Sequence, residues 1–223
     1  MKPIKSTQSG FTLVEIAIVL VIIGLLLGGV LKGQEMIENA KIKNAIADMN
    51  GISAAYNAYV DRFRALPGDD GPLATLQARG GNWANITVAG APVNGVIAVT
   101  QAQVFTGVTE GLAFWQAEKA AGFISGNPSD IGIAALPRNA FNGVTGVGTG
   151  VGPVATAVFS VCMSQVPGKS ARAMDLQLDD GISDRGSFRA TIGVPGANTA
   201  PGALAPSPAN YTDNSQYTVC RAL

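Results

Sequence analysis

The stretch that decides the fold is GFTLVEIAIVLVIIGLLLGGVLKG, residues 10–33. Its apolar part runs from Phe11 to Leu31, and a helix of that length, rising about 1.5 Å per residue, covers the roughly 30 Å hydrocarbon core of a bilayer. Glu15 is the only charged residue in this run, and a carboxylate is costly in hydrocarbon. The stretch therefore predicts a transmembrane helix over residues 11–31 in which Glu15 needs a specific role.

The residues on either side of this run predict that it is retained and how it is oriented. No small-x-small cleavage site follows Leu31, as it would after the apolar part of a secretory signal peptide. Lys2 and Lys5 precede the run, which favours a cytoplasmic N-terminus and an exported remainder. Within the run, Gly24 and Gly28 form a GxxxG pattern, which is either a surface for close helix approach or incidental.

Helical periodicity continues beyond the membrane run. Apolar residues recur at spacings of three and four, which is typical of an amphipathic helix. They are Ile42, Ile46, Met49, Ile52, Tyr56, Tyr59 and Phe63. No proline occurs between Phe11 and Pro67, and Gly51 costs a helix only about 1 kcal/mol. The pattern predicts one long helix over residues 11–66, apolar on all sides at first and on one face later.

The composition narrows the functions that the chain could have. Of its 223 residues, 13% are charged, the formal net charge is zero and none is histidine. Without histidine, His-based catalytic triads and most zinc or iron sites are excluded. No basic patch stands out, so nucleic acid is not expected as a main partner.

The long helix is predicted to end at ALPGDDGP, residues 65–72, because proline and glycine break helices and aspartate suits turns. Residues 67–223 then form a head. Within it, TEGLAFWQAEKAAGFISG (residues 109–126) predicts a short amphipathic helix. Three β-like segments follow: PVATAVFSVCM (153–163), GSFRATIGV (186–194) and NSQYTVCRAL (214–223). The expected fold is α+β, a long N-terminal helical spine packed on a small antiparallel sheet.

The segment KSTQSGFTLVEIAIVLVIIGLLL, residues 5–27, resembles the start of a type IV prepilin, the family of type IV pilins and type II secretion pseudopilins. In that family a prepilin peptidase removes a short basic leader ending in glycine, the new N-terminal residue is N-methylated, and a glutamate follows four residues later. The resemblance implies a leader over residues 1–10, cleavage between Gly10 and Phe11, N-methylation of Phe11 and an assembly role for Glu15. The LPGD sequence at residues 66–69 also recurs in a subset of pilin-like proteins.

The resemblance also implies why Glu15 is tolerated. In related filaments the helices pack in a staggered bundle, so Glu15 of one subunit can meet the amine of Phe11 in a neighbour. Opposite charges about 4 Å apart attract by about 4 kcal/mol at an effective dielectric of about 20. Glu15 would then set the register of assembly. The alternative is a side chain that reaches the cytoplasmic interface of the membrane.

Cys162 and Cys220 are the only cysteines. In an exported head they can form one intrachain disulfide, or they can remain as buried free thiols. Many pilins have a C-terminal region bounded by a disulfide, so the resemblance favours the bond, which would close a loop of about 58 residues.

Four carboxylates gather in MDLQLDDGISDRG, at Asp175, Asp179, Asp180 and Asp184. They could offer oxygen ligands to calcium, which some pseudopilins bind in the head. The spacing is not that of an EF-hand, however, and Asp-Asp-Gly commonly marks a turn between strands. A structural turn is the favoured interpretation, and no other cofactor is expected.

Two other patterns also have a functional and a structural interpretation. TGVGTGVGP, residues 145–153, superficially resembles a phosphate-binding loop but lacks its Lys-Ser/Thr, so a flexible loop is predicted. Trp83, Phe114 and Trp115 could form a binding surface, but in a chain with 6% aromatic residues we expect them to build the core.

Three classes of function remain. The favoured one is a structural filament subunit with no enzymatic activity, whose partners are copies of itself, prepilin peptidase, an inner-membrane assembly platform, a motor ATPase and, before assembly, membrane lipid. The second is a minor or tip pilin, or a pseudopilin, whose head binds a ligand or substrate. The third is a membrane-anchored periplasmic enzyme, for which the aspartates are thin support. The precursor is expected in the inner membrane, and the assembled subunit in a cell-surface pilus or periplasmic pseudopilus.

One departure leaves the choice among these assemblies open. Many major pilins carry a proline near the end of the apolar run, whereas VLKGQEM, residues 30–36, has none.

Overall fold

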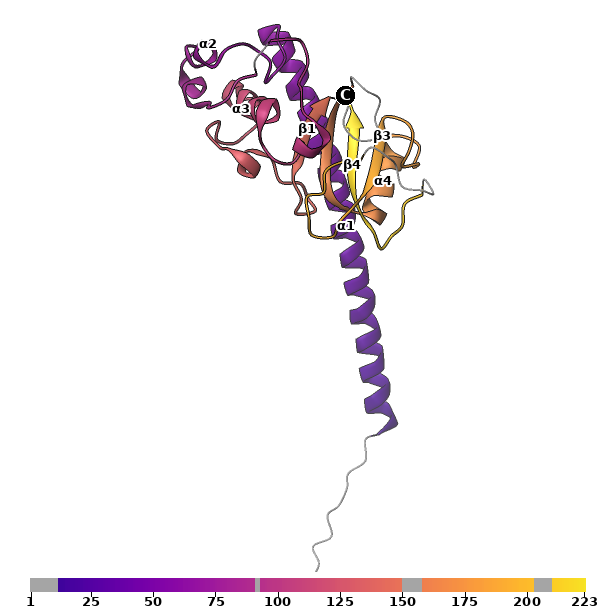
Figure 1. Ribbon diagram of the computed structural model, residues 1–223. Helices are drawn as coiled ribbons and strands as arrows, with labels where there is room; N and C mark the ends of the chain where they lie inside the picture. The colour runs from indigo at the N-terminus through magenta and orange to yellow at the C-terminus, as the bar shows by residue number, and fades with distance from the viewer. Residues whose placement is uncertain (1–11, 91–92, 150–157, 203–209) are drawn as a thin grey trace, which may run out of the picture. The chain divides into compact units, whose positions relative to one another are not determined.

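The computed structural model describes residues 12–90, 93–149, 158–202 and 210–223. The chain divides into two compact units, residues 1–40 and 41–223. Helix α1 (Leu13–Phe63) comes first, and the strands of the one described sheet lie in the second half of the chain (Figure 1). The predicted long helix is confirmed, although it ends at Phe63 rather than at 66. Arg64 adopts a left-handed conformation (φ 55°), which ends the helix before Pro67.

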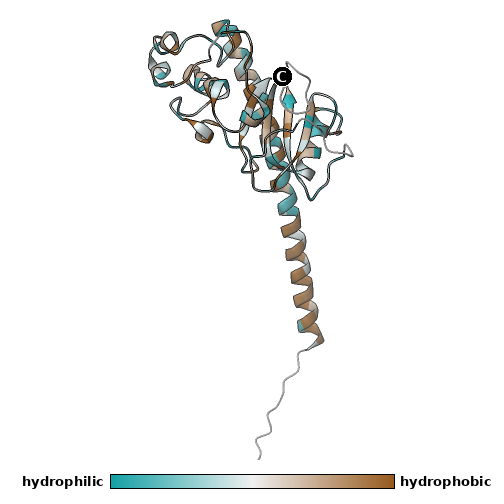
Figure 2. Ribbon diagram, in the orientation of Figure 1, coloured by the Kyte–Doolittle hydropathy of each residue, from teal (hydrophilic) through white to brown (hydrophobic). Residues whose placement is uncertain are grey.

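The first unit contains the part of α1 that precedes residue 41. Its large apolar side chains from Leu13 to Leu31 are exposed, and Figure 2 shows this segment as a nearly continuous hydrophobic stretch. By length and composition α1 could cross a membrane, with a mean hydropathy of 2.8 over its most apolar 18 residues. Charged residues return at Lys32 and Glu35, which form an exposed ion pair with a nitrogen–oxygen distance of 2.9 Å.

In the second unit, α1 uses one face for packing, as the apolar periodicity predicted. The fully buried positions recur at helical spacing and include two alanines that extend the stripe: Ile42, Ala45, Met49, Ile52, Ala55 and Tyr59. Ile46, Tyr56 and Phe63 are half-buried beside them. Lys41, Lys43 and Asp61 are exposed on the remaining surface. The stripe therefore directs this half of α1 toward the core.

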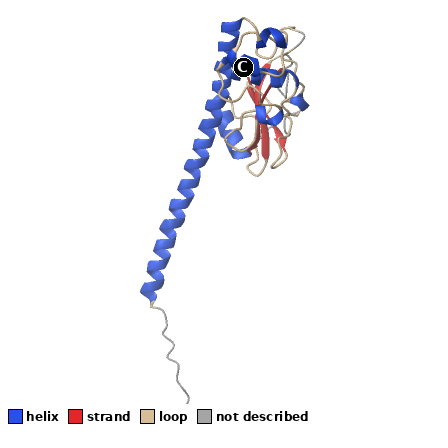
Figure 3. Cartoon of the chain, turned by 90° about the vertical axis from the view of Figure 1, so that its left-hand side faces the viewer, coloured by secondary structure: helices blue, strands red, loops and turns tan. Residues whose placement is uncertain are grey.

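The sheet has four antiparallel strands in the order β1-β2-β4-β3. Their bounds are β1 Thr145–Thr149, β2 Phe159–Pro167, β3 Phe188–Gly193 and β4 Gln216–Ala222. Helix α4 (Gly168–Leu178) connects β2 to β3. Figure 3 shows the sheet beside helical segments of the same unit. The predicted α+β fold, with a long helix packed on a small antiparallel sheet, is confirmed.

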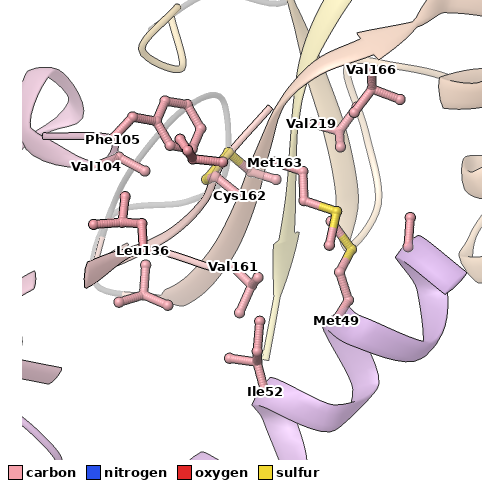
Figure 4. Close-up of a cluster of buried hydrophobic side chains, with 14 of the residues drawn as sticks. Met49, Ile52, Val104, Phe105, Leu136, Val161, Cys162, Met163, Val166 and Val219 are labelled. Carbon is pink, nitrogen blue, oxygen red and sulfur yellow. A yellow bond between two sulfur atoms is a disulfide. The ribbon is translucent and has the colours of Figure 1, made fainter. Parts of the chain in front are cut away.

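The main core lies where α1 meets the sheet. Met49 and Ile52 of α1 point toward Val161, Met163 and Val219 of the two central strands, β2 and β4 (Figure 4). All five are at most 6% exposed. Burying one such side chain contributes about 1.5–3 kcal/mol, so this contact is a major reason why the helix stays on the sheet.

Short helices and helix α3 form the rest of the second unit. Their bounds are α2 Leu73–Gln77, η1 Gly81–Asn85, η2 Gln101–Gln103, α3 Thr109–Ala121 and η3 Gly132–Ala135. A second core cluster joins α1, α2, η1 and α3 through Tyr59, Leu76, Trp83, Ile86, Ala117 and Ala120.

Helix α3 confirms the helix predicted in residues 109–126. The prediction that this helix is amphipathic was wrong. Every residue from Gly111 to Ala120 is buried. Loops and short helices cover the side of α3 that a simple helix-on-sheet arrangement would leave in solvent, and Gln116 ties one such loop to it. Gln116 accepts hydrogen bonds from the backbone nitrogens of Thr87 (2.8 Å) and Val88 (3.0 Å).

The predicted flexible loop at residues 145–153 was wrong for its first five residues, which form strand β1. Residues 150–153 lie outside the described part of the chain. A Cβ at Gly146 would lie 2.1 Å from the carbonyl oxygen of Val104. Glycine here allows close approach of two backbones, which is a use of glycine inside a strand.

The turn after α1 is fixed by backbone packing rather than by composition alone. Gly68 has φ +86°, and a Cβ there would come within 2.7 Å of the backbone nitrogen of Phe114 in α3. The buried carboxylate of Asp69 accepts hydrogen bonds from the backbone nitrogens of Asn94 (3.1 Å) and Gly95 (2.6 Å). The LPGD turn therefore locks the end of α1 against α3 and the loop at 94–95.

Candidate functional site

The start of α1 carries the charged residue that the membrane run predicted to be special. The backbone nitrogen and the hydroxyl of Thr12 both donate hydrogen bonds to Oε2 of Glu15, each at 2.8 Å. The backbone nitrogen of Glu15 donates in return to the Thr12 hydroxyl at 3.3 Å. This is a capping box, in which two otherwise unpaired N–H groups at a helix start are satisfied reciprocally.

This role of Glu15 was missed in the sequence, although Thr12-Leu-Val-Glu15 before an apolar run is the pattern of a capping box. Both Thr12 donors use the same carboxylate oxygen. Among the described residues, Oε1 of Glu15 accepts no hydrogen bond. One oxygen therefore holds the helix start while the other is open to a further donor.

Gly10 and Phe11, between which cleavage is predicted, lie outside the described residues, and so does the predicted N-methylation of Phe11. The two glycines of the predicted GxxxG pattern do lie within α1. A Cβ added at Gly24 or Gly28 would meet no atom of the chain within 4 Å. Both positions are open on the helix surface, so packing within the described part of one chain does not require glycine at either.

The far end of α1 is held by a partly buried polar network. The hydroxyl of Tyr59 donates to Asp70 Oδ2 at 2.7 Å, and Arg79 forms an ion pair with the same oxygen at 2.7 Å. The Arg79 guanidinium also lies over the rings of Phe63 and Trp83, 4.7 and 4.6 Å from their centroids. Burial and the neighbouring Asp70 raise the pKa of Tyr59 far above its ordinary value. The network anchors the last turns of α1 in the head.

Cys162 and Cys220 form the disulfide that the resemblance implied, with an S–S distance of 2.04 Å. The two residues are directly opposite one another on β2 and β4. Both are at most 1% exposed and belong to the main core. The bond therefore joins the two central strands and bounds the segment that contains α4 and β3.

Three of the four candidate calcium ligands do lie together. Carboxylate oxygens of Asp175, Asp179 and Asp180 are within 4.8 Å of one another. Asp184 lies outside this group, and its Oδ1 is 3.3 Å from Nε of Arg185. The pKa of Asp175 is raised, and burial is the largest cause.

The grouped carboxylates already serve as hydrogen-bond acceptors. Asp175 accepts from the Tyr211 hydroxyl at 2.6 Å and from the Gly181 nitrogen at 3.0 Å. Asp179 accepts from the nitrogen of Phe188 at 3.1 Å. Calcium takes six to eight oxygens, and the described cluster brings together carboxylates from three residues. These hydrogen bonds favour the structural turn.

The location of that turn differs from the prediction. MDLQL forms the last part of α4, so Asp179-Asp180-Gly181 connects a helix to strand β3 rather than one strand to another. The carboxylate of Asp179 caps the start of β3 by accepting from Phe188, which is the physical reason for an aspartate at this position.

The aromatic residues proposed as a possible surface are part of the core, as expected. Phe114 and Trp115 are 0% and 1% exposed, and Trp83 is 8% exposed. Phe114 and Trp115 form an edge-to-face pair with ring centroids 5.0 Å apart.

One buried acidic residue gave no recognisable signal in the sequence. Glu118 in α3 is 0% exposed, and neither of its carboxylate oxygens has a hydrogen-bond partner among the described residues. Burial raises its pKa to about 8. The folded chain therefore holds a carboxylic acid that is mostly neutral at pH 7.

Comparison with known proteins gives two matches. The prokaryotic N-terminal methylation motif matches residues 5–31, which include Gly10, Phe11 and Glu15. The fimbrial protein EcpC of Eikenella corrodens is 31% identical over 111 residues, a region that covers 49% of this chain and 71% of that protein. The first match covers the apolar run and the residues directly before it, where the end of the leader is predicted.

Proposed function

The chain belongs to the type IV pilin-like family, and we propose that it is a structural subunit of a type IV pilus-like filament that assembles through the first part of α1. The family points to a structural role rather than catalysis. The observation that carries the proposal is the apolar surface of α1 from Leu13 to Leu31, which is exposed in the single chain and suits lipid before assembly and other helices afterwards.

The proposal includes a division of the chain into functional parts. Residues 1–10 are a leader that prepilin peptidase removes, with cleavage between Gly10 and Phe11 and N-methylation of Phe11. Residues 11–31 anchor the precursor in the inner membrane with a cytoplasmic N-terminus, and residues 67–223 form the exported head. An assembly platform and a motor ATPase then move subunits from the membrane into the filament, either a pilus or a pseudopilus.

Glu15 is proposed to pair with the amine of Phe11 in a neighbouring subunit. The capping box supports this because it uses only Oε2 and leaves Oε1 available. The carboxylate can therefore keep the helix start ordered and still accept a donor from another chain. Removing one partner of a buried ion pair typically costs about 3–5 kcal/mol, which is enough to prevent assembly at cellular concentrations.

Two substitutions separate the charge of Glu15 from its capping role. Glu15→Gln keeps a side-chain oxygen for the Thr12 donors but removes the charge, whereas Thr12→Val removes the hydroxyl donor and keeps the charge. We expect normal membrane insertion for both, at least about tenfold less sheared filament for Glu15→Gln, and near wild-type filament for Thr12→Val. Filament yield is measured by immunoblot of shear fractions against the membrane-bound pool.

A wild-type yield of filament for Glu15→Gln would contradict the ion-pair role. If Glu15→Gln assembles like wild type while Glu15→Ala does not, the carboxylate acts through the capping box alone. Mass spectrometry of the mature chain gives an independent check, since processing predicts a first residue Phe11 that carries a methyl group.

A further inference from the structure

The head contains a cleft that the assembly role does not use. It has a volume of about 490 Å³, within the range of about 300–1,000 Å³ that is usual for small-molecule sites. Its lining includes Asp48 and Gly51 of α1, Lys119 of α3 and Asp130 from the following loop. Arg138, after η3, completes the charged lining. All these residues belong to the second unit.

Lys119 is the most deeply placed of these charges, since its side chain is 5% exposed. Its ammonium nitrogen is 3.3 Å from Oδ2 of Asp130 and 3.5 Å from the carbonyl oxygen of Asn127. Charge-assisted hydrogen bonds to an ammonium are usually about 2.7–2.9 Å long, and an ammonium has three donors. Lys119 therefore retains donor capacity for a group in the cleft.

Glycine next to this side chain shows that the loop is built around it. A Cβ at Gly126 would come within 2.8 Å of Cε of Lys119, and the φ of +137° at this position favours glycine, so the loop lies close against the lysine. The side chain of Asp48, which also lines the cleft, has no hydrogen bond or ion pair with another described residue, and burial raises its pKa. The lining thus offers an open acceptor, the Asp48 carboxylate, and a donor with remaining capacity, the Lys119 ammonium.

The charges along the cleft balance, two acidic and two basic, and this decides the chemistry of the ligand. An anion that approaches Lys119 is also repelled by the Asp130 carboxylate beside it. A net negative charge on the ligand therefore adds little binding free energy. A hydroxyl group both donates and accepts, and two neighbouring hydroxyls can donate to Asp130 and accept from Lys119 across their 3.3 Å separation. A neutral ligand with several hydroxyls satisfies every group without introducing an unpaired charge.

We propose that this cleft is a binding site for a neutral monosaccharide or disaccharide, with Lys119 and Asp130 holding a pair of adjacent hydroxyls and Asp48 accepting from a third. The site is independent of filament assembly, because none of its lining residues lies in the exposed apolar part of α1.

Gly51 allows a test that does not disturb the charged residues. A Cβ at this position would meet no atom within 4 Å, and leucine is a better helix former than glycine, so Gly51→Leu fills the cleft without strain in α1. Gly51→Ala is the matched control, because it gives the same backbone benefit and leaves most of the volume open.

The probes are glucose, galactose, N-acetylglucosamine and lactose, titrated into the full chain in a detergent without a sugar head group. Isothermal titration calorimetry or ligand-observed NMR reports binding. We expect at least one probe to bind at about 1 mM or tighter, Gly51→Leu to weaken it at least about tenfold, and Gly51→Ala to change it less than about threefold. Glycylglycine and inorganic phosphate serve as zwitterionic and anionic comparisons.

Three results would overturn the proposal. They are no binding by any of the four sugars, equal binding by the two Gly51 variants, and binding only by glycylglycine or phosphate. None of these results bears on filament assembly, which the shear assay measures separately.

Discussion

The buried carboxyl group of Glu118 makes the stability of the head depend on pH in a direction opposite to that of an ordinary carboxylate. The folded chain holds its proton up to about pH 8, whereas the unfolded chain releases it near the ordinary value of 4.5. Between these values the folded state binds more protons than the unfolded state, so the free energy of unfolding falls as pH rises. The stabilising contribution is complete below pH 4.5 and is lost by about pH 8.

The magnitude follows from the two pKa values. At about 1.4 kcal/mol per pH unit, with the slope falling off near each pKa, wild type should lose about 3 kcal/mol between pH 4.5 and 7, and about 4 kcal/mol by pH 8. Glu118→Gln has nearly the same shape and no titration. We therefore expect it to match wild type near pH 4.5 and to be about 3 kcal/mol more stable at pH 7, a shift of about 1–2 M in the urea midpoint.

The chain is well suited to this measurement. Its two tryptophans, Trp83 and Trp115, are both buried in the head, so their fluorescence reports unfolding of that part in detergent. There is no histidine to titrate between pH 5.5 and 8. Asp61→Asn is the control, because the Asp61 side chain is 82% exposed and its removal should leave the pH slope unchanged. The reasoning is refuted if Glu118→Gln keeps the wild-type slope or is less stable than wild type at pH 8.

Three further outcomes are expected. Replacing both Cys162 and Cys220 by alanine should lower the free energy of unfolding by about 4 kcal/mol from the closed loop alone, measured by urea titration; an unchanged midpoint would contradict a stabilising disulfide. Gly68→Ala should cost about 2 kcal/mol or more, because the residue has φ +86° and its Cβ would meet the backbone of Phe114, whereas the control Gly33→Ala, in open space, should not. Millimolar calcium or EDTA should shift the thermal midpoint of wild type by less than about 1 °C, and a larger calcium-dependent rise that Asp180→Asn abolishes would establish a site.

The long helix and three strands could be predicted because their signals are local. Seven apolar residues between Ile42 and Phe63 repeat at helical spacing, and Pro67 sets a limit that no distant contact can remove. The β-branched and aromatic residues of β2, β3 and β4 likewise express a local preference. The disulfide needed the resemblance as well, since two cysteines alone left free thiols open.

The features that were missed depend on contacts distant in sequence. Strand β1 contains two glycines, which indicate a loop unless the nearby Val104 backbone is known. The complete burial of α3 depends on loops that no helical period describes, and so does the isolation of Glu118. The capping box of Thr12 and Glu15 is different, because its signal was present locally and was outweighed by the family hallmark at the same glutamate.

The position of β4 constrains the order in which the chain can become a folded protein. It is the last of the four strands in sequence, yet it lies between β2 and β3. During synthesis the apolar helix leaves the ribosome first, and residues 216–222 follow roughly two hundred residues later. Strand β3 therefore has no neighbour to pair with until β4 has been synthesised. Ribosome stalling or premature termination before this point should therefore yield a head in which β3 is unpaired and exposed to proteases, rather than a smaller stable one.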